Sequence, residues 1–283
     1  MKIGLIQMAC GPSPKANLTR AASLVGQAAA KGARIVLLQE LYRTEYFCKT
    51  EDPRNFDLAE PIPGPSTDFF CRLAKSGRIV LVAPLFEKRA KGIYHNTAVV
   101  IDADGKVLGK YRKMHIPDDP GFYEKFYFVP GDLGFKSFKT RYAEIGVLIC
   151  WDQWFPEAAR LSALSGAEIL FYPTAIGWKT GRRREAESYR DAWETVQRGH
   201  AIASGVFVAA ANRVGREGGF EYWGSSFVAD PFGKIIRRAS AVKEEALVVD
   251  CDLSQVEKIR REWPFLRDRR VDAYKGILSR SSE

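Results

Sequence analysis

The chain alternates between short apolar runs, typical of buried strands, and longer segments whose apolar residues recur at helical spacing. The apolar runs predict strands at 2–8, 35–38, 79–84, 96–101, 144–150, 169–172, 207–212, 225–229 and 246–250. Recurrence every three or four positions predicts helices, most clearly at 17–31, 156–165 and 189–204. Helices separate several of the strands, and turn sequences at 102–105 and 230–233 join others as hairpins, so the pattern indicates an α/β fold.

The sequence shows no linker that would divide the chain into two domains. A chain of 283 residues that is 46% hydrophobic can form one large α/β domain or two smaller ones. The Pro/Gly cluster at 60–66 runs straight into an amphipathic stretch at 67–75, as an ordered loop before a helix would. Without a linker or repeat, residues 1–283 are expected to form a single domain. The first residues resemble a strand and not a signal peptide or membrane span, so we expect a cytoplasmic protein with no membrane partner.

Cysteine and histidine spacing argues against disulfides and metal sites. These residues are Cys10, Cys48, Cys71, Cys150 and Cys251, with His95, His115 and His200. They lack the paired spacing of a zinc site or a disulfide framework. We therefore expect no metal and no cofactor.

The net charge of +9 raises the question of nucleic-acid binding. Arginines cluster at 182–184 and 267–270, but acidic residues interrupt or follow both clusters. No RNA-binding signature is visible, which favours solvated surface or a subunit contact. We expect no nucleic-acid partner, and retention on heparin or RNA at low salt would test this.

Cys150 is placed differently from the other cysteines. It ends the apolar run 145–150, and Pro156 soon afterwards is a residue tolerated in the first turn of a helix. The thiol is therefore predicted to lie at a strand-to-helix junction, where nucleophiles are presented. A free cysteine taken alone is more often an inert residue of the core, so the assignment of Cys150 as a nucleophile depends on other residues.

Two further predicted strand ends carry residues that acyl transfer requires. Glu40 follows the strand 35–38, and a carboxylate can accept the proton of a thiol and later activate water. Lys113 lies in the segment 109–115, and an ammonium there, with the backbone N–H of Trp151, would stabilise a developing oxyanion. The alternatives are a surface carboxylate and a solvated hairpin lysine.

The segments around Glu40, Lys113 and Cys150 resemble the Glu-Lys-Cys triad of the nitrilase (carbon-nitrogen hydrolase) superfamily, over nearly the whole chain. The resemblance also covers 111–118 (YRKMHIPD), 124–132 (EKFYFVPGD), 150–160, 172–178 (YPTAIGW) and 197–200 (QRGH). It implies a four-layer α-β-β-α sandwich, with Glu40 as general base, Lys113 as oxyanion stabiliser and Cys150 as nucleophile. Glu124 aligns with a second glutamate that orients the substrate or the lysine; a loop carboxylate paired with a cation is the alternative.

Members of this superfamily pair through the outer helical layer, and their C-terminal segment reaches a partner subunit. Residues 255–283 are expected to form such an arm, because Trp263, Phe265 and Leu266 are apolar residues in a charged tail. The resemblance thus implies a homodimer or a higher homo-oligomer. A tail folded on its own subunit is the alternative.

The superfamily cleaves nitriles, amides and N-carbamoyl compounds, so the substrate must be inferred from the pocket. Relatives that bind carboxylate-bearing substrates place an arginine soon after the nucleophile, whereas this chain has Asp152, Gln153 and Trp154. A neutral or cationic small molecule is therefore expected, such as a carbamoylated alkyl amine, cleaved through a thiol-bound carbamoyl intermediate. Another amidase or carbamoylase activity, or a catalytically silent scaffold, are the alternatives.

A carbamoylated alkyl amine needs an apolar wall for its methylenes and an acid or aromatic face for its ammonium. The expected wall residues are Trp151, Tyr123 and Trp178, and the expected acids are Asp119, Glu187 or Asp191.

Overall fold

The computed structural model describes residues 1–181 and 183–281, and only the backbone at 183–186. Two six-stranded sheets dominate it. The first has the order β17-β1-β2-β3-β4-β5, with bounds Glu245–Asp250, Lys2–Gln7, Ile35–Leu38, Val80–Ala90, Ile93–Ile101 and Val107–Arg112. The second has the order β16-β15-β12-β10-β9-β8, with bounds Ile235–Arg238, Phe227–Ala229, Phe207–Ala211, Ile169–Pro173, Glu144–Val147 and Ser137–Lys139.

Smaller elements join the ends of the main strands. A two-stranded ribbon pairs β6 (Asp118–Asp119) with β7 (Phe122–Tyr123), and a three-stranded sheet contains β11 (Gly177–Lys179), β14 (Phe220–Trp223) and β13 (Val214–Glu217). The α-helices are α1 (Pro14–Ala30), α2 (Pro65–Gly77), α3 (Glu124–Tyr127), α4 (Pro156–Leu164), α5 (Arg183–Ser204) and α6 (Ser254–Glu262). The 3₁₀ helices are η1 (Phe47–Lys49), η2 (Pro53–Leu58), η3 (Cys150–Trp154) and η4 (Val271–Leu278).

Strand β2 shows why the chain stacks in layers. All four of its residues are apolar and buried, and successive side chains of a strand point to opposite faces. Ile35 and Leu37 belong to the core that continues into the second sheet, whereas Val36 and Leu38 pack in a separate core with residues of α1 and α2. A strand covered on both faces must read as a continuous apolar run, which is the pattern observed.

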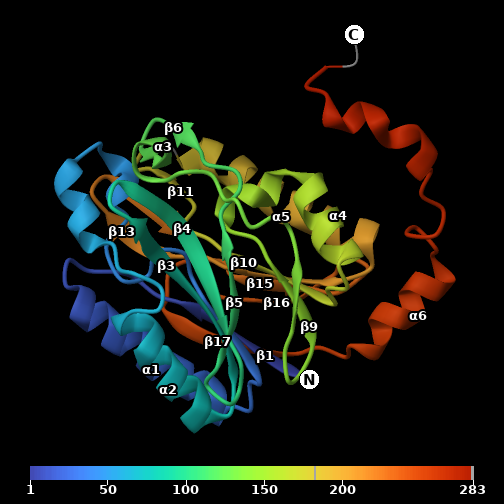
Figure 1. Cartoon of the computed structure of the whole chain (residues 1–283), viewed down its shortest axis with the longest axis horizontal. Coiled ribbons are helices and arrows are strands. Elements are labelled where there is room, and N and C mark those ends of the chain that lie inside the picture. The colour runs from blue at the N-terminus through green and yellow to red at the C-terminus, as the bar shows by residue number, and fades with distance from the viewer. Residues whose placement is uncertain (182, 282–283) are drawn as a thin grey trace.

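Helices α4 and α5 cover the outer face of the second sheet, and α1 and α2 cover the first (Figure 1). The predicted α-β-β-α sandwich is therefore confirmed. Among the described residues, none of the helices combines the length and the apolar character that a membrane span requires.

Several predicted boundaries differ from the observed ones, and two of these differences have clear local reasons. The first helix begins at Pro14 and not at residue 17, because the hydroxyl of Ser13 caps it by accepting a hydrogen bond from the backbone N–H of Ala16. The predicted strand 144–150 ends as β9 at Val147, because the chain turns at Cys150, where φ is +44°. Such a left-handed φ is uncommon for a residue other than glycine.

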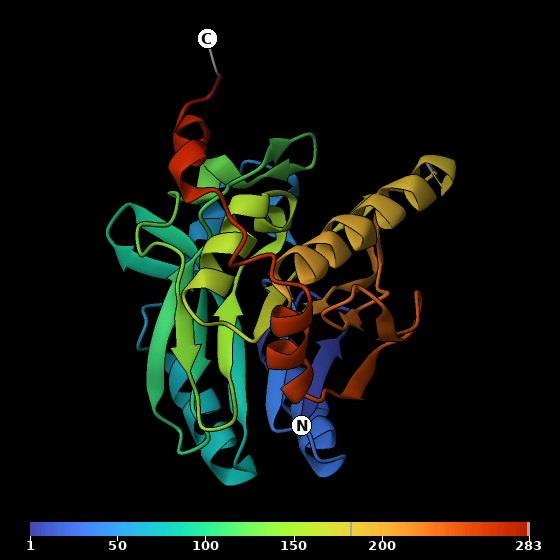
Figure 2. The same cartoon turned by 90° about the vertical axis from the view of Figure 1, so that its right-hand side faces the viewer.

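The C-terminal segment after α6 extends away from the sandwich (Figures 1 and 2). Several of its apolar side chains are open to solvent, including Trp263 (52% exposed), Ile277 (62%) and Leu278 (89%). Isolated exposed apolar residues are ordinary, whereas here several lie on one segment.

Candidate active site

Glu40 lies just after the end of β2 and is fully buried. Its Oε1 accepts hydrogen bonds from Asn96 Nδ2 (2.7 Å) and Lys113 Nζ (2.8 Å). Its Oε2 is buried and has no hydrogen-bond partner among the described residues. A buried carboxylate oxygen that lacks a donor is costly, which marks a place for a proton or a ligand.

Lys113 follows β5 and is 1% exposed. Its Nζ donates to Glu124 Oε2 (2.6 Å) as well as to Glu40 Oε1. Burial alone would lower the pKa of Lys113, but the charges of Glu124 and Glu40 outweigh it and raise that pKa well above the usual value. The lysine is therefore held as an ammonium.

Glu124 opens helix α3 and is equally buried. Its Oε1 accepts a hydrogen bond from the hydroxyl of Tyr46 (2.7 Å). Burial, followed by the neighbouring charge of Glu40, raises the pKa of Glu124 to about 7, with the lysine acting in the opposite direction. Two carboxylates thus share one ammonium, and the group can gain or lose a proton near neutral pH.

Cys150 starts the turn η3 on the second sheet, whereas Glu40 and Lys113 extend from the first. Burial, and then the charge of Glu40, raise the pKa of the Cys150 thiol, although Lys113 acts to lower it. The resting thiol is therefore protonated and needs a base before it can attack.

Asp152 ties the turn of Cys150 to the segment after Lys113. Its Oδ2 accepts from the backbone N–H of Ile149 (2.8 Å) and from the hydroxyl of Tyr111 (2.8 Å). Its Oδ1 accepts from the backbone N–H of His115 (3.0 Å). This structural role was not predicted, although an acidic residue two positions after a candidate nucleophile was a signal for it.

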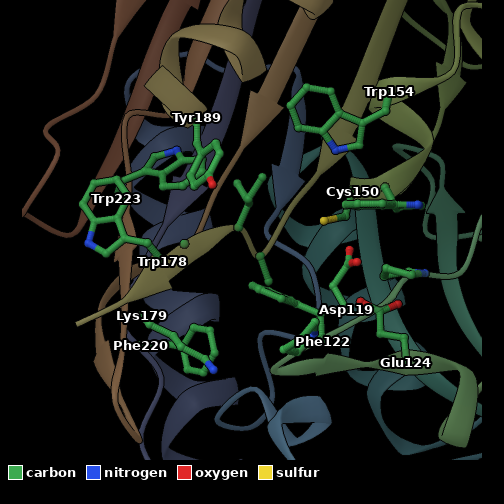
Figure 3. A pocket seen from close by; sticks show the side chains of 16 residues that line it. Asp119, Phe122, Glu124, Cys150, Trp154, Trp178, Lys179, Tyr189, Phe220 and Trp223 are labelled. Carbon is green, nitrogen blue, oxygen red and sulfur yellow. The ribbon is translucent and has the colours of Figure 1, made fainter. Parts of the chain in front are cut away.

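A cavity of about 610 Å³ opens beside Cys150 (Figure 3). Seven aromatic side chains line it, namely Trp151, Trp154, Phe122, Trp178, Tyr189, Phe220 and Trp223. Its charged lining residues are Asp119, Glu124 and Lys179. Such a cavity suits a small molecule with an alkyl chain and few polar groups.

The structure places Trp151, Trp178 and Asp119 in this wall, as predicted. Tyr123 is absent from the described lining, because neighbours in a strand point to opposite sides and Phe122 takes the inward position. The placement of Tyr123 in the pocket was therefore wrong.

Glu187 is exposed and does not line the cavity in the part of the chain that is described, and the same holds for Asp191. Each lies two residues from Tyr189 on α5, about 200° around the helix axis, so the two acids point away when Tyr189 points inward. Neither acid therefore forms part of the described cavity wall. Of the predicted arginine cluster at 182–184, residue 182 and the side chains of 183 and 184 lie outside the described residues.

Residues 2–261 match the model of the carbon-nitrogen hydrolase family. The chain therefore belongs to this family, whose members hydrolyse carbon–nitrogen bonds other than peptide bonds.

Similar proteins span the whole chain. The N-carbamoylputrescine amidase of Oryza sativa subsp. japonica is 45% identical over 292 residues, covering 100% of this chain and 96% of that protein. The citrullinase of Francisella tularensis is 42% identical over 283 residues, covering 98% of each. The crystal structure of a carbon-nitrogen hydrolase from Helicobacter pylori G27 is 50% identical, covers 100% of this chain and 99% of its own, and superposes with a TM-score of 0.96.

Proposed function

We propose that the protein hydrolyses N-carbamoylputrescine to putrescine, carbon dioxide and ammonia, with Cys150 as the nucleophile. The observation that carries the proposal is the Lys113 ammonium held between Glu40 and Glu124, next to a thiol at the wall of an aromatic cavity. The similarity to plant enzymes with this activity supports it.

In the first half of the reaction, Glu40 accepts the thiol proton and the sulfur of Cys150 attacks the ureido carbon. The carbonyl oxygen becomes an oxyanion, which the Lys113 ammonium and the backbone N–H of Trp151 stabilise. When the tetrahedral adduct collapses, the C–NH₂ bond breaks, and ammonia leaves with the proton that Glu40 held. The product is a carbamoyl group bound through sulfur.

In the second half, Glu40 takes a proton from water as the water attacks the same carbon. The C–S bond breaks and the proton returns to the thiol, which releases a carbamate. Decomposition of the carbamate gives putrescine and carbon dioxide. Glu124 does not contact the reacting bond in this scheme; it holds Lys113 in place.

The far end of the substrate is an ammonium, and we propose that Asp119 binds it. Asp119 lines the cavity, and no side-chain hydrogen bond or ion pair occupies its carboxylate among the described residues. The rings of Trp178 and Trp223 offer an apolar surface for the methylenes.

A substrate panel tests this assignment. Ammonia release from N-carbamoylputrescine is expected to exceed that from N-carbamoyl-β-alanine and butyramide, because only the first pairs with Asp119. In Asp119→Asn, the ratio of kcat/KM for N-carbamoylputrescine to that for butyramide is expected to fall about tenfold. An unchanged ratio would remove Asp119 as the ammonium partner, while equal rates on all compounds would discard the assigned substrate and keep the triad.

A second candidate substrate is a ureido amino acid, because Lys179 lines the same cavity as Asp119. Together these residues offer one cation and one anion, which complement the carboxylate and the ammonium of citrulline. Citrulline therefore belongs in the panel. If the protein prefers citrulline and Lys179→Ala abolishes that preference, citrulline and not N-carbamoylputrescine is the substrate.

We propose that residues 255–283 pack against a second copy of the chain. The exposed Trp263, Ile277 and Leu278 support this, and α4 also leaves Leu161 (46%) and Leu164 (43%) exposed. Sedimentation at micromolar concentration is expected to give at least twice the chain mass of 31.7 kDa. Ile277→Ser combined with Leu278→Ser should shift that species toward the monomer, and a monomeric wild-type protein would contradict the proposal.

We also propose a cytoplasmic location, because all five cysteines are free and Cys150 must stay reduced to react. Cell fractionation tests this, and recovery of the protein outside the cytoplasmic fraction would count against it.

A further inference from the structure

We propose that Arg213, Glu217 and Tyr46 are positioning residues that fix Glu40 and Glu124 around Lys113 through a closed ring of hydrogen bonds. The inference rests on the proposed function for its kinetic consequences. None of the three belongs to the triad, and none lines the cavity among the residues described.

The first part of the ring holds the backbone of Glu40. Arg213 follows β12 on the second sheet, and its side chain is fully buried. Its Nη2 donates to the backbone oxygens of Glu40 (3.2 Å) and Leu41 (2.8 Å). Leu41 has a φ of +47°, which costs energy for a leucine and persists only when its surroundings hold it. Arg213, which follows β12 of the second sheet, thus holds the turn at the end of β2 in the first sheet.

The second part of the ring reaches Glu124. Arg213 Nη1 donates to Glu217 Oε1 (2.7 Å), and Glu217 Oε2 accepts from the backbone N–H of Tyr46 (2.7 Å). The hydroxyl of Tyr46 donates to Glu124 Oε1, and Lys113 closes the ring by donating to both Glu124 and Glu40.

The composition of the ring distinguishes it from a simple buried ion pair. Removing a guanidinium from water costs free energy, and a single ion pair offsets only part of that cost. Arg213 has one carboxylate partner, Glu217, and its other acceptors are backbone oxygens of Glu40, Leu41 and Thr44. These contacts fix the chain that carries the base, and they follow from the position of the arginine between the two sheets.

Tyr46→Phe is the sharpest test, because it removes one hydroxyl and leaves a ring of the same shape. Glu124 then loses a donor that stabilises its ionised form, and its carboxylate is free to move away from the position that holds Lys113. Since a small displacement in an active site can cost up to about 100-fold, we expect kcat to fall at least tenfold with KM within twofold.

The pH profile separates positioning from a general loss of folded protein. The groups facing Glu124 are Lys113, Glu40, Tyr46, Cys48 and Cys150. Losing the tyrosine hydroxyl raises the pKa of Glu124, so a reaction that needs its carboxylate loses activity at a higher pH. The acid limb of kcat/KM is therefore expected to move upward in Tyr46→Phe.

Tyr172→Phe is the matched control. The Tyr172 side chain is also fully buried, and its hydroxyl has no hydrogen-bond partner among the described residues. It is expected to keep kcat within twofold and the acid limb unchanged. If both variants lose activity equally, or if Tyr46→Phe matches the wild type, the ring has no positioning role.

Glu217→Gln tests the remote side of the ring. It weakens the link from Arg213 to Tyr46 and is expected to lower kcat, with KM within twofold. Combined with Tyr46→Phe, it should cost less than the sum of the two single changes, because both act on one ring. Glu60→Gln is its control, since Glu60 is a buried carboxylate paired with Arg43 outside the ring. Additive effects, or an equal loss in Glu60→Gln, would overturn the proposal.

Alkylation of Cys150 by iodoacetamide, followed by peptide mass mapping, gives a readout that needs no substrate. Thiolate formation requires Glu40 and Lys113 in place, so the rate at pH 7 is expected to fall at least threefold in Tyr46→Phe and to stay unchanged in Tyr172→Phe. A wild-type protein that cleaves no panel compound would end the proposed function, and this comparison would still decide the ring. Equal alkylation rates in all three proteins would overturn it.

Discussion

Cys150→Ala is expected to abolish ammonia release, with kcat falling by at least about 10⁴-fold. The substitution removes the sulfur that bonds to the substrate, and neither Glu40 nor Lys113 can form the same covalent intermediate. Because the change deletes one buried atom at a turn, the fold is expected to persist. Ammonia release under saturating substrate and thermal unfolding of the same sample together measure both effects.

The control for this variant is Cys71→Ala, which changes a half-buried thiol on α2. It is expected to keep the wild-type rate. Full activity in a folded Cys150→Ala protein would exclude covalent catalysis by this residue, and a loss in Cys71→Ala of similar size would point to a general effect of thiol removal.

Lys113→Ala is expected to lower kcat by at least about 100-fold, the range found when a principal oxyanion donor is removed. It should also destabilise the fold, by about 3–5 kcal/mol if both carboxylates stay ionised, because Glu40 and Glu124 would be buried without their counter-ion. Proton uptake by Glu124, whose pKa burial already raises to about 7, would relieve part of that cost. The loss of stability is therefore expected to be smaller at pH 5 than at pH 8, as measured by denaturant unfolding at both values.

The matched control for Lys113→Ala is the variant Lys110→Ala. Lys110 lies on strand β5, which ends just before Lys113, and pairs with Glu87. We expect little effect of this change on kcat. If folded Lys113→Ala keeps more than a tenth of the wild-type kcat, the ammonium is not the principal oxyanion donor.

The sequence predicted the strand ends that carry Glu40 and Cys150, because each follows a continuous apolar run, as expected of a strand covered on both faces. Lys113 follows β5, whose sequence is not a continuous apolar run, so the pattern did not predict that strand. The resemblance to a known family then supplied the four layers. Periodicity alone contains no information on which sheet a strand joins, so the pairing of one base and one nucleophile across two sheets could not be derived from it.

The errors at the cavity have a different origin. The sequence analysis chose Tyr123 instead of Phe122 and Glu187 instead of Tyr189. Avoiding these errors required knowing how a two-residue strand and a helix are rotated about their own axes. Two-residue strands give no alternation to read, and α5 has polar residues on much of its surface near residue 187. The residue types predicted an aromatic cavity wall with an acidic residue in it, whereas the particular residues that form the wall depend on tertiary packing.

The partners of Glu124 were also beyond the reach of sequence patterns. Tyr46 lies 78 residues away along the chain, and its hydroxyl meets the carboxylate only because η1 and α3 pack together. The segment between β2 and η1 shows no helical or strand periodicity, so nothing in it separated a buried tyrosine from an exposed one.

The nucleophile stands on one sheet, and the base and the ammonium stand on the other. Side chains in the core between the sheets, such as Leu37 and Phe171, therefore set how far the sulfur lies from the groups that activate it. The thickness of that core therefore determines how the nucleophile is placed relative to the base and the ammonium. Substitutions there can change the reaction rate without altering any residue that substrate touches, and a comparison of relatives confined to cavity residues would miss the cause.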